Sequence, residues 1–185
     1  MTDDAQWYST EADEHGFLDF DKLARKARAL SEDDFVAAYP RPALRVVYRG
    51  DGVADEPASD RSGVQLLTVA VKSVGILRYL SRVAFVAKRP GAPFAHLVSI
   101  GRSNNNDITM AVESVSKVHG YLVLEEGRCR FTDHGSTNGS KLNGAPLEKN
   151  EKYTLGDGDI LHLGLETALE FLTPMSLYRK LRAGS

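Results

Sequence analysis

The sequence predicts a mainly β protein, an antiparallel β-sandwich with helices before and after it. Short apolar runs alternate with turn residues from about residue 82 to residue 173, a pattern typical of antiparallel sandwiches. Apolar residues at helical spacing precede this region, and a proline-led apolar segment follows it. The 185 residues, 42% hydrophobic and 26% charged, are typical of a globular protein with one domain and an appendage.

The N-terminal segment is predicted to contain an acidic tail and then two short helices. Residues 1–16 are rich in acidic residues and poor in apolar ones. Apolar residues then recur at helical spacing from residue 20 to residue 30, which predicts the first helix. Ser31 is placed as the N-cap of a second helix, which Pro40 ends.

The β region begins with two predicted strands, over residues 43–48 and 64–71, on either side of a loop rich in Gly, Pro, Ser and Asp. Periodicity does not decide between helix and strand for residues 74–79. In the last apolar run, residues 161–171, leucine and phenylalanine fall on odd positions and polar residues on even ones. This alternation predicts strands with one buried and one wet face.

Two signals beyond the β region predict a C-terminal helix. Pro174 suits the first turn of a helix, and Gly184 suits the position just after its end. We therefore divide the chain into three parts. They are an N-terminal extension over residues 1–81, a sandwich over residues 82–173, and a C-terminal helix and tail over residues 174–185.

Charge and cysteine content exclude several classes of function. Lys plus Arg number 23 and Asp plus Glu 25, and the net charge of −2 provides no broad positive field for nucleic acid or an anionic membrane. The single cysteine, Cys129, excludes an intrachain disulfide and a cysteine-rich metal site, and the histidines lack metal-ligand spacing. The N-terminus is acidic and no apolar run reaches about 18 residues, so we expect a cytoplasmic protein. We also expect no metal and no cofactor.

Three turn segments carry more polar residues than a turn requires. They are Gly101–Asp107 (GRSNNND), Ser114–His119 (SVSKVH) and Asp133–Gly139 (DHGSTNG). Their Gly-Arg, Ser-x-x-His and Ser-x-Asn-Gly patterns, in this order and at these separations, resemble the signatures of the forkhead-associated (FHA) domain. The resemblance covers about residues 82–173 and extends to two downstream turns, at residues 143–144 and 156–159.

This resemblance implies an FHA-like antiparallel sandwich of about eleven strands, whose loops at one end bind phosphothreonine in an extended peptide. It implies that Arg102 contacts the phosphate, that Ser116 donates its hydroxyl to it, and that Lys117 stands where the family often has Arg or another polar residue. Thr137 would line the pocket, and Asn138 would hydrogen-bond the peptide main chain. Structural support for the loops would come from Gly101, His119 and Gly139.

The residue types suit this task on chemical grounds as well. A phosphorylated side chain carries about −1.5 to −2 charges and three acceptor oxygens, so a protein that binds it needs fixed donors and a cation. Hydrogen bonds to charged groups contribute roughly 1.5–3 kcal/mol each. Because Lys117 is a point charge on a flexible stem and Arg102 presents a planar fork of donors, we expect Arg102 to contribute more.

The implied function is that of a signalling adaptor downstream of Ser/Thr kinases, with a threonine-phosphorylated protein as its partner. One alternative stays open, a phosphorylation-independent interaction or self-association through the same sandwich. No enzyme is expected and no catalytic residue is assigned, because Ser136 follows Gly135 directly and no strand-to-helix elbow presents a nucleophile. The identity of the partner and its preferred residues around the phosphothreonine do not follow from the sequence.

Overall fold

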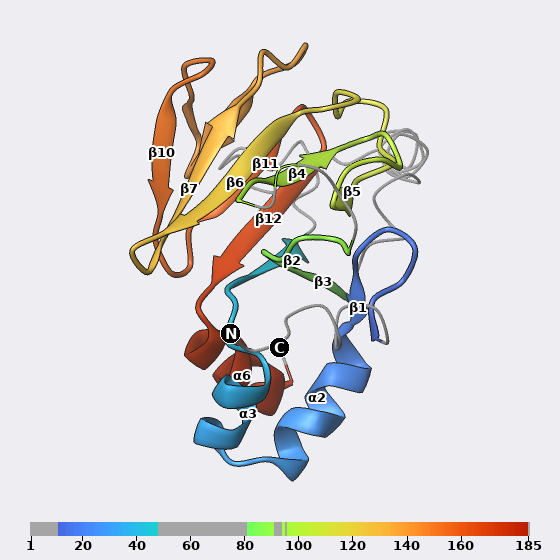
Figure 1. Ribbon diagram of the computed structural model, residues 1–185, viewed down its shortest axis with the longest axis vertical. Helices are drawn as coiled ribbons and strands as arrows, with labels where there is room; N and C mark the ends of the chain where they lie inside the picture. The colour runs from blue at the N-terminus through green and yellow to red at the C-terminus, as the bar shows by residue number, and fades with distance from the viewer. Residues whose placement is uncertain (1–10, 48–80, 91–93, 95, 185) are drawn as a thin grey trace, which may run out of the picture.

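A computed structural model describes residues 11–47, 81–90, 94 and 96–184. These residues form two packed β-sheets with three helices gathered at one end (Figure 1). The fold class predicted from the sequence, a mainly β sandwich with helices near both ends of the chain, is confirmed. The predicted strand over residues 64–71 and the undecided segment over residues 74–79 lie outside the described residues.

The larger sheet has seven strands, each antiparallel to its neighbours. In order across the sheet they are β1 (Leu18–Asp19), β3 (Arg82–Phe85), β2 (Ala43–Val47), β12 (Thr167–Leu172), β11 (Ile160–Leu163), β8 (Ser140–Leu142) and β9 (Ala145–Pro146). The central strand is β12, and all six of its residues are buried. Strand β2 is therefore a full member of the sheet, because it pairs with β12 along its whole length.

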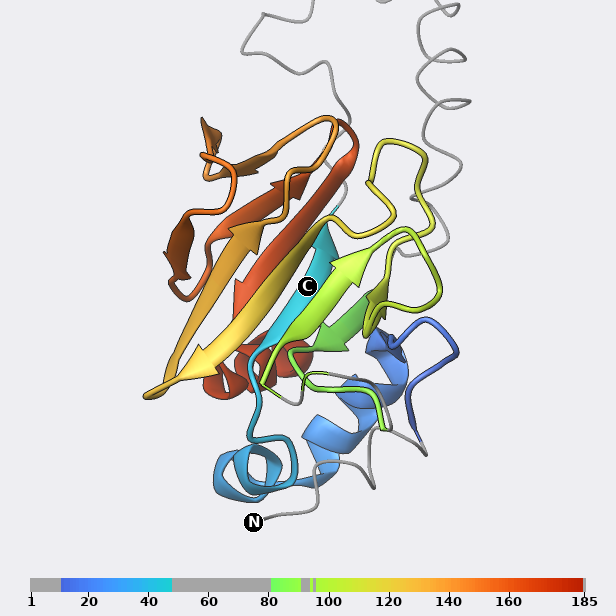
Figure 2. The ribbon, with the colours of Figure 1, turned by 45° about the horizontal axis from the view of Figure 1, so that its top comes forward.

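The smaller sheet has five strands and faces the larger one (Figure 2). In order they are β10 (Lys152–Leu155), β7 (Arg128–Asp133), β6 (Gly120–Glu125), β4 (Val98–Gly101) and β5 (Ile108–Thr109). The pairing of β4 with β5 is parallel, and the others are antiparallel. The core between the two sheets contains Ile100, Leu122, Phe131, Leu161 and Leu169, all fully buried. Four of the five apolar residues predicted at odd positions of residues 161–171 thus point into this core, whereas Leu165, in the turn between β11 and β12, is 63% exposed.

Three helices cover the outer face of the larger sheet near one of its ends. They are α2 (Phe20–Ala29), α3 (Glu32–Ala38) and α6 (Pro174–Ala183). Ser31 caps α3 as predicted, accepting a hydrogen bond from the amide of Asp34, and α6 begins at Pro174 and ends at a left-handed Gly184 with φ of 75°. None of the helices among the described residues is long and apolar enough to cross a membrane.

The helices and the sheet share a second hydrophobic core, which includes Phe35, Phe85 and Leu177. Because the helices pack on this face of the larger sheet, one expectation from the sequence, a solvent-exposed Glu170, is wrong. Glu170, an even position expected on a wet face, is only 9% exposed. It is buried as an ion, with Arg45 at 2.9 Å and Lys180 of α6 at 2.8 Å, because α6 lies over that face of β12.

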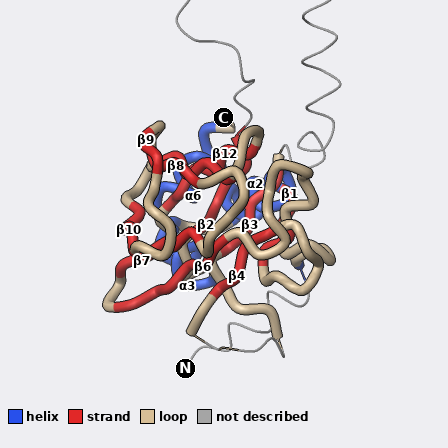
Figure 3. Tube along the Cα trace, turned by 90° about the horizontal axis from the view of Figure 1, so that it is seen from above, coloured by secondary structure: helices blue, strands red, loops and turns tan. Residues whose placement is uncertain are grey.

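The three polar turn segments of the sequence join strands at the other end of the sandwich, away from the helices (Figures 1 and 3). Residues 101–107 connect β4 to β5, residues 114–119 lead into β6, and residues 133–139 connect β7 to β8. We call them the first, second and third loops. Antiparallel pairing explains their meeting, because the start of β6 lies opposite the end of β7 and the end of β4.

Candidate functional site

The first and second loops pack backbone against backbone at Gly101. A Cβ atom at Gly101 would lie 2.5 Å from the carbonyl oxygen of Lys117 and 2.9 Å from the amide nitrogen of His119, so only glycine fits there. The next residue, Arg102, donates its amide hydrogen to the carbonyl of Ser116 at 2.8 Å. The arginine and the serine to which the resemblance assigns phosphate contacts are therefore held side by side through their main chains.

A buried asparagine fastens the same two loops. The side-chain amide of Asn106, 2% exposed, donates to the carbonyl oxygens of Ser103 and Lys117, both at 2.7 Å. The amide of Ser103 also donates to the carbonyl of Lys117, at 3.1 Å. Sequence reasoning assigned no role to Asn106, because its partners are main-chain carbonyls that no residue type reveals.

The third loop is joined to the second by side chains that face solvent. The hydroxyl oxygen of Ser116 accepts from the amide of Thr137 at 2.9 Å, and its hydrogen is donated to the Thr137 hydroxyl over a longer 3.4 Å. The side-chain amide of Asn138 donates to the carbonyl of Ser114 at 2.8 Å. Thr137 and Asn138 are exposed and Ser116 is half-buried, so all three line the same open surface.

Under this surface, the fully buried side chain of His119 takes part in a chain of hydrogen bonds. Its Nδ1 accepts from the amide of Ser116 at 3.1 Å, so we assign the neutral tautomer with the proton on Nε2. Nε2 then donates to the hydroxyl of Ser140 at 3.1 Å, which donates to the carboxylate of Asp133 at 2.5 Å. Burial lowers the pKa of His119, although Asp133 and the backbone of Gly139 act in the opposite direction.

Asp133 receives hydrogen bonds at both carboxylate oxygens. The amide and the hydroxyl of Ser136 each donate to it at 2.7 Å, in addition to the hydroxyl of Ser140. Burial raises the pKa of Asp133, but these hydrogen bonds outweigh burial and the pKa lies below its ordinary value. The third loop is thus built around a buried carboxylate, and Gly139 ends it with φ of 73°.

The positive charges of the site are available to a ligand. Arg102 and Lys117 are exposed, and among the described residues no carboxylate forms an ion pair with either of them. The guanidinium of Arg102 is oriented by a hydrogen bond from Nε to the carbonyl of Val115 at 3.1 Å. This bond leaves the two terminal nitrogens to face an anion with two oxygens.

The geometry differs from that of a serine nucleophile paired with a histidine base. The hydroxyl of Ser116 is bonded to Thr137, and only its amide reaches His119. The hydroxyl that does contact His119 belongs to Ser140, which is 3% exposed. Within the described residues, no group of three or more His, Cys, Asp or Glu side chains is arranged to hold a metal ion.

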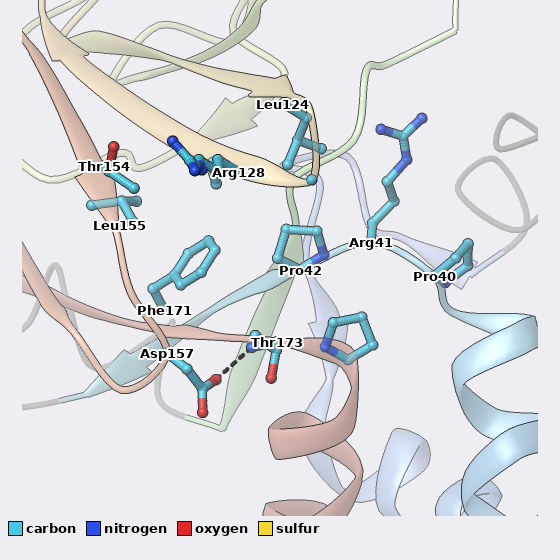
Figure 4. Close-up of a pocket in the computed structure, with 13 residues that line it drawn as sticks. Pro40, Arg41, Pro42, Leu124, Arg128, Thr154, Leu155, Asp157, Phe171 and Thr173 are labelled. Atoms are coloured by element: carbon cyan, nitrogen blue, oxygen red, sulfur yellow. Dashed lines mark hydrogen bonds between the residues drawn. The ribbon is translucent and has the colours of Figure 1, made fainter.

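A cavity lies at the end of the strands opposite the three loops. Its volume is about 580 Å³, and it is lined by residues 40–42, the turn between β6 and β7, the end of β10, the end of β12 and the start of α6 (Figure 4). The carboxylate of Asp157 in its wall accepts from the amide of Thr173 at 2.7 Å and from the hydroxyl of Ser176 at 2.5 Å. This cavity is separate from the three loops, since Glu125 and Arg128 are at the far ends of the strands that carry them.

Comparison with known proteins finds a family model that matches the part of the chain carrying the three loops. Residues 98–164 match the family model of the FHA domain, and this range contains all three loops. The FHA resemblance seen in the sequence is thereby confirmed.

The relatives and solved structures similar to this chain include two proteins and one complex. The chain is similar to the ABC transporter ATP-binding/permease protein Rv1747 of Mycobacterium tuberculosis, with 33% identity over 118 residues, which are 64% of this chain and 12% of that protein. It is 32% identical over 73 residues to the FHA domain-containing protein At4g14490 of Arabidopsis thaliana, covering 39% of this chain and 19% of the relative. It therefore spans only a small part of the length of either relative.

Among solved structures, the chain is similar to the N-terminal FHA domain of Rad53p from S. cerevisiae, solved in complex with a phosphothreonine peptide. The identity is 20% and the TM-score 0.45, and the match covers 75% of this chain and 98% of that one.

Proposed function

We propose that this chain is a phosphopeptide-binding module that recognises phosphothreonine in a partner protein through its three loops. The observation that carries the proposal is the convergence of Arg102, Ser116 and Asn138 on one open surface. Within the part of the chain that the structure describes, no carboxylate forms an ion pair with Arg102 or Lys117. A site of fixed donors and cations suits a ligand that carries about −1.5 to −2 charges and three acceptor oxygens.

Each side chain has a role that its present contacts support. The terminal nitrogens of Arg102 bind two phosphate oxygens, since Nε is already held by Val115. The hydroxyl of Ser116 exchanges its long 3.4 Å bond to Thr137 for a bond to the phosphate, a stronger charge-assisted acceptor. Lys117 adds a second positive charge from the rim of the site.

Thr137 and Asn138 position the peptide on the other side of Ser116. Both are short polar residues that lose little side-chain freedom when they are fixed, and both are exposed on the third loop. Asn138 bonds the peptide main chain, and its amide is already directed by the carbonyl of Ser114. Phosphothreonine is preferred over phosphoserine through its methyl group, whose burial contributes about 0.8 kcal/mol.

The biological role that follows is that of a cytoplasmic adaptor, without metal or cofactor, that joins a Ser/Thr kinase pathway by binding a threonine-phosphorylated protein. The similarity of residues 98–164 to the FHA domain, and the phosphothreonine peptide in the Rad53p complex, support this role. The residues that we place in the site are Arg102, Ser116, Lys117, Thr137 and Asn138, supported by Gly101, His119 and Gly139.

The test compares one peptide with and without its phosphate. A library of phosphothreonine peptides is screened against the full chain, and the best binder is then measured by calorimetry in both forms at pH 7.5. We expect the unphosphorylated form to bind at least about 100-fold more weakly, because two charge-assisted hydrogen bonds of roughly 1.5 kcal/mol each are lost. Equal affinity of the two forms would contradict the proposal and favour a phosphorylation-independent interaction.

A further inference from the structure

The first loop is held from two sides. On one side, the main chain of Arg102 is bonded to Ser116 of the second loop. On the other side lie residues 88–89, in the connection between β3 and β4. These two residues lie outside residues 98–164, the range that matches the FHA family model.

A buried carboxylate fixes the end of the first loop to this connection. Asp107, which is fully buried, accepts hydrogen bonds from the amide of Arg89 at 2.9 Å and from the ammonium of Lys88 at 2.8 Å. The same carboxylate accepts from the amide and the hydroxyl of Ser99, both at 2.8 Å. The main chain of Arg89 is therefore held beside the loop.

The guanidinium of Arg89 joins the first loop to the N-terminal segment. One terminal nitrogen donates to the carbonyl of Asn104 at 2.9 Å, and the other donates to the carbonyl of Glu14 at 3.1 Å. Asn104 is two residues from Arg102 in the first loop. Because both terminal nitrogens of Arg89 bind main-chain carbonyls, the planar fork of this arginine bridges two segments of the protein.

The N-terminal end of this bridge is a compact turn formed by residues 13–17. The carboxylate of Asp13 accepts from the amides of His15 and Phe17 at 3.0 and 2.9 Å, and the amide of Asp13 donates to the carbonyl of Phe17 at 2.8 Å. Phe17 is fully buried in the core between the sheets. The carbonyl of His15 accepts from the amide of Thr109 in β5 at 2.9 Å, so the turn lies beside that strand (Figures 1 and 2). The turn is thus a fixed point of attachment for the arginine that binds it.

We propose that Arg89 is a positioning residue of the phosphate site, which holds the first loop, and with it Arg102, against the N-terminal turn. This inference rests on the proposed function, because that function gives Arg102 its phosphate contact. A loop that is already held in place loses less conformational entropy when a ligand binds, so the bridge increases affinity without contacting the peptide. The N-terminal turn, which lies within the predicted extension of residues 1–81, thereby contributes to phosphopeptide binding.

A double-mutant cycle with Arg102 tests this role. Calorimetry at pH 7.5 measures the affinity of the phosphothreonine peptide selected by the library screen for the parent chain, Arg89→Ala, Arg102→Ala and the double variant. We expect Arg89→Ala to weaken binding about fivefold in the parent chain, the effect of losing about one net hydrogen bond, but less than about twofold in Arg102→Ala. The second loss is smaller because a loop without Arg102 has little phosphate contact left to position.

A role in stability or in charge alone would give a different cycle. Equal losses in the two backgrounds would mean that Arg89 acts independently of Arg102 and would overturn the inference. An affinity of Arg89→Ala within about twofold of the parent chain would overturn it as well. Urea titration of each variant establishes that the chain is folded under the conditions of the binding measurement.

Two further variants separate the bridge from its charge. Arg82→Ala removes the same charge and an arginine that contacts the same turn, 3.4 Å from the carboxylate of Asp13, and its affinity should stay within about twofold of the parent chain. Arg89→Lys keeps the charge but presents a single point in place of a fork, so it should still weaken binding about threefold. Full affinity in folded Arg89→Lys, or a fivefold loss in Arg82→Ala, would mean that charge alone acts and would overturn the inference.

The positioning role and the proposed function can fail separately. If binding depends on phosphate and on Arg102 while Arg89→Ala has no effect, the positioning role is wrong and the proposed function stands. Equal binding of the phosphorylated and unphosphorylated peptides would overturn both.

Discussion

In the proposed site, Arg102 is the residue on which we expect phosphate binding to depend most. Its Nε is held by the carbonyl of Val115 at 3.1 Å, so its fork of terminal nitrogens is oriented before a ligand arrives. We predict that Arg102→Ala weakens binding of the selected phosphopeptide at least tenfold and that Lys117→Ala weakens it less, because an ammonium binds as a single point. Calorimetry with each purified variant measures both effects.

A matched control for this prediction is Arg25→Ala. Arg25 is an exposed arginine on α2, at the end of the molecule away from the loops, and its removal lowers the net charge by the same amount. We expect its affinity to stay within about twofold of the parent chain, since exposed charges beyond about 10 Å are largely screened at 0.1 M salt. A result in which Arg102→Ala also stays within twofold would refute the assigned role.

At the scale of elements, α6 is attached to the sandwich through its buried leucines. Leu177 and Leu181 are fully buried in the core shared with α2 and α3. We predict that Leu181→Ala lowers the free energy of unfolding by about 3 kcal/mol, the usual cost of removing a buried leucine side chain. Met175→Ala on the same helix should change it by less than about 0.5 kcal/mol, because Met175 is 45% exposed. Urea titration of the three chains measures the difference.

The same pair of variants tests the separation of the two ends. Because α6 lies at the end away from the three loops, phosphopeptide affinity of folded Leu181→Ala should equal that of the parent chain (Figure 1). An unfolding free energy of Leu181→Ala equal to that of Met175→Ala would mean that α6 is not part of the folded core.

At the scale of the whole molecule, the buried His119 and Asp133 make stability depend on pH. Burial lowers the pKa of His119 in the folded chain, so below its ordinary value of 6.5 the unfolded chain binds a proton that the folded chain does not. The contribution of neutral His119 to the free energy of unfolding is therefore greatest above about pH 6.5 and decreases as the pH falls below that value. For Asp133, the pKa also lies below its ordinary 3.8, because hydrogen bonds outweigh burial, and a further loss follows as the pH falls through that value.

This prediction is checked by urea unfolding at a series of pH values from 7.5 to 5. The loss of stability between pH 6.5 and pH 5 should be smaller in His119→Gln, which has no ionisable group at the buried position. His134→Gln, at an exposed neighbouring histidine, should keep the slope of the parent chain. A free energy of unfolding that rises as the pH falls from 6.5 to 5 would contradict the assignment of a neutral His119.

The elements differ in how far they follow from local sequence. The caps at Ser31 and the Pro174 start of α6 were predicted correctly, because capping depends on residues within one turn. The alternation over residues 161–171 predicted the core-facing side chains of β11 and β12, because a strand has a period of two, but it was wrong for Leu165, which lies in the turn between them and is exposed. The partner of β2 was not predictable, since β12 lies more than 100 residues further along the chain. The wet face expected at Glu170 was wrong, because α6 covers it.

The residues of the site likewise fall into those that could be predicted from the sequence and those that could not. Its charged and hydroxyl-bearing residues follow from the residue types that a phosphate requires, and the order of three signatures pointed to the FHA domain, which the match over residues 98–164 confirms. Their individual contacts with phosphate stay a prediction, as does the division of the chain at residues 81 and 173. Asn106 and Ser140 were missed, because their partners are reached only when the loops come together.

What the sequence by itself determined are the features with short-range causes: the β-rich class, the helix ends, the turn glycines and the chemistry of the three loops. Tertiary structure alone decided which strands pair, that α6 buries Glu170 as an ion, and that Arg89 joins the N-terminal turn to the first loop. The physical reason is that these contacts join residues far apart in the chain. They form only after the loop-closure entropy between those residues has been offset by burial of a common core.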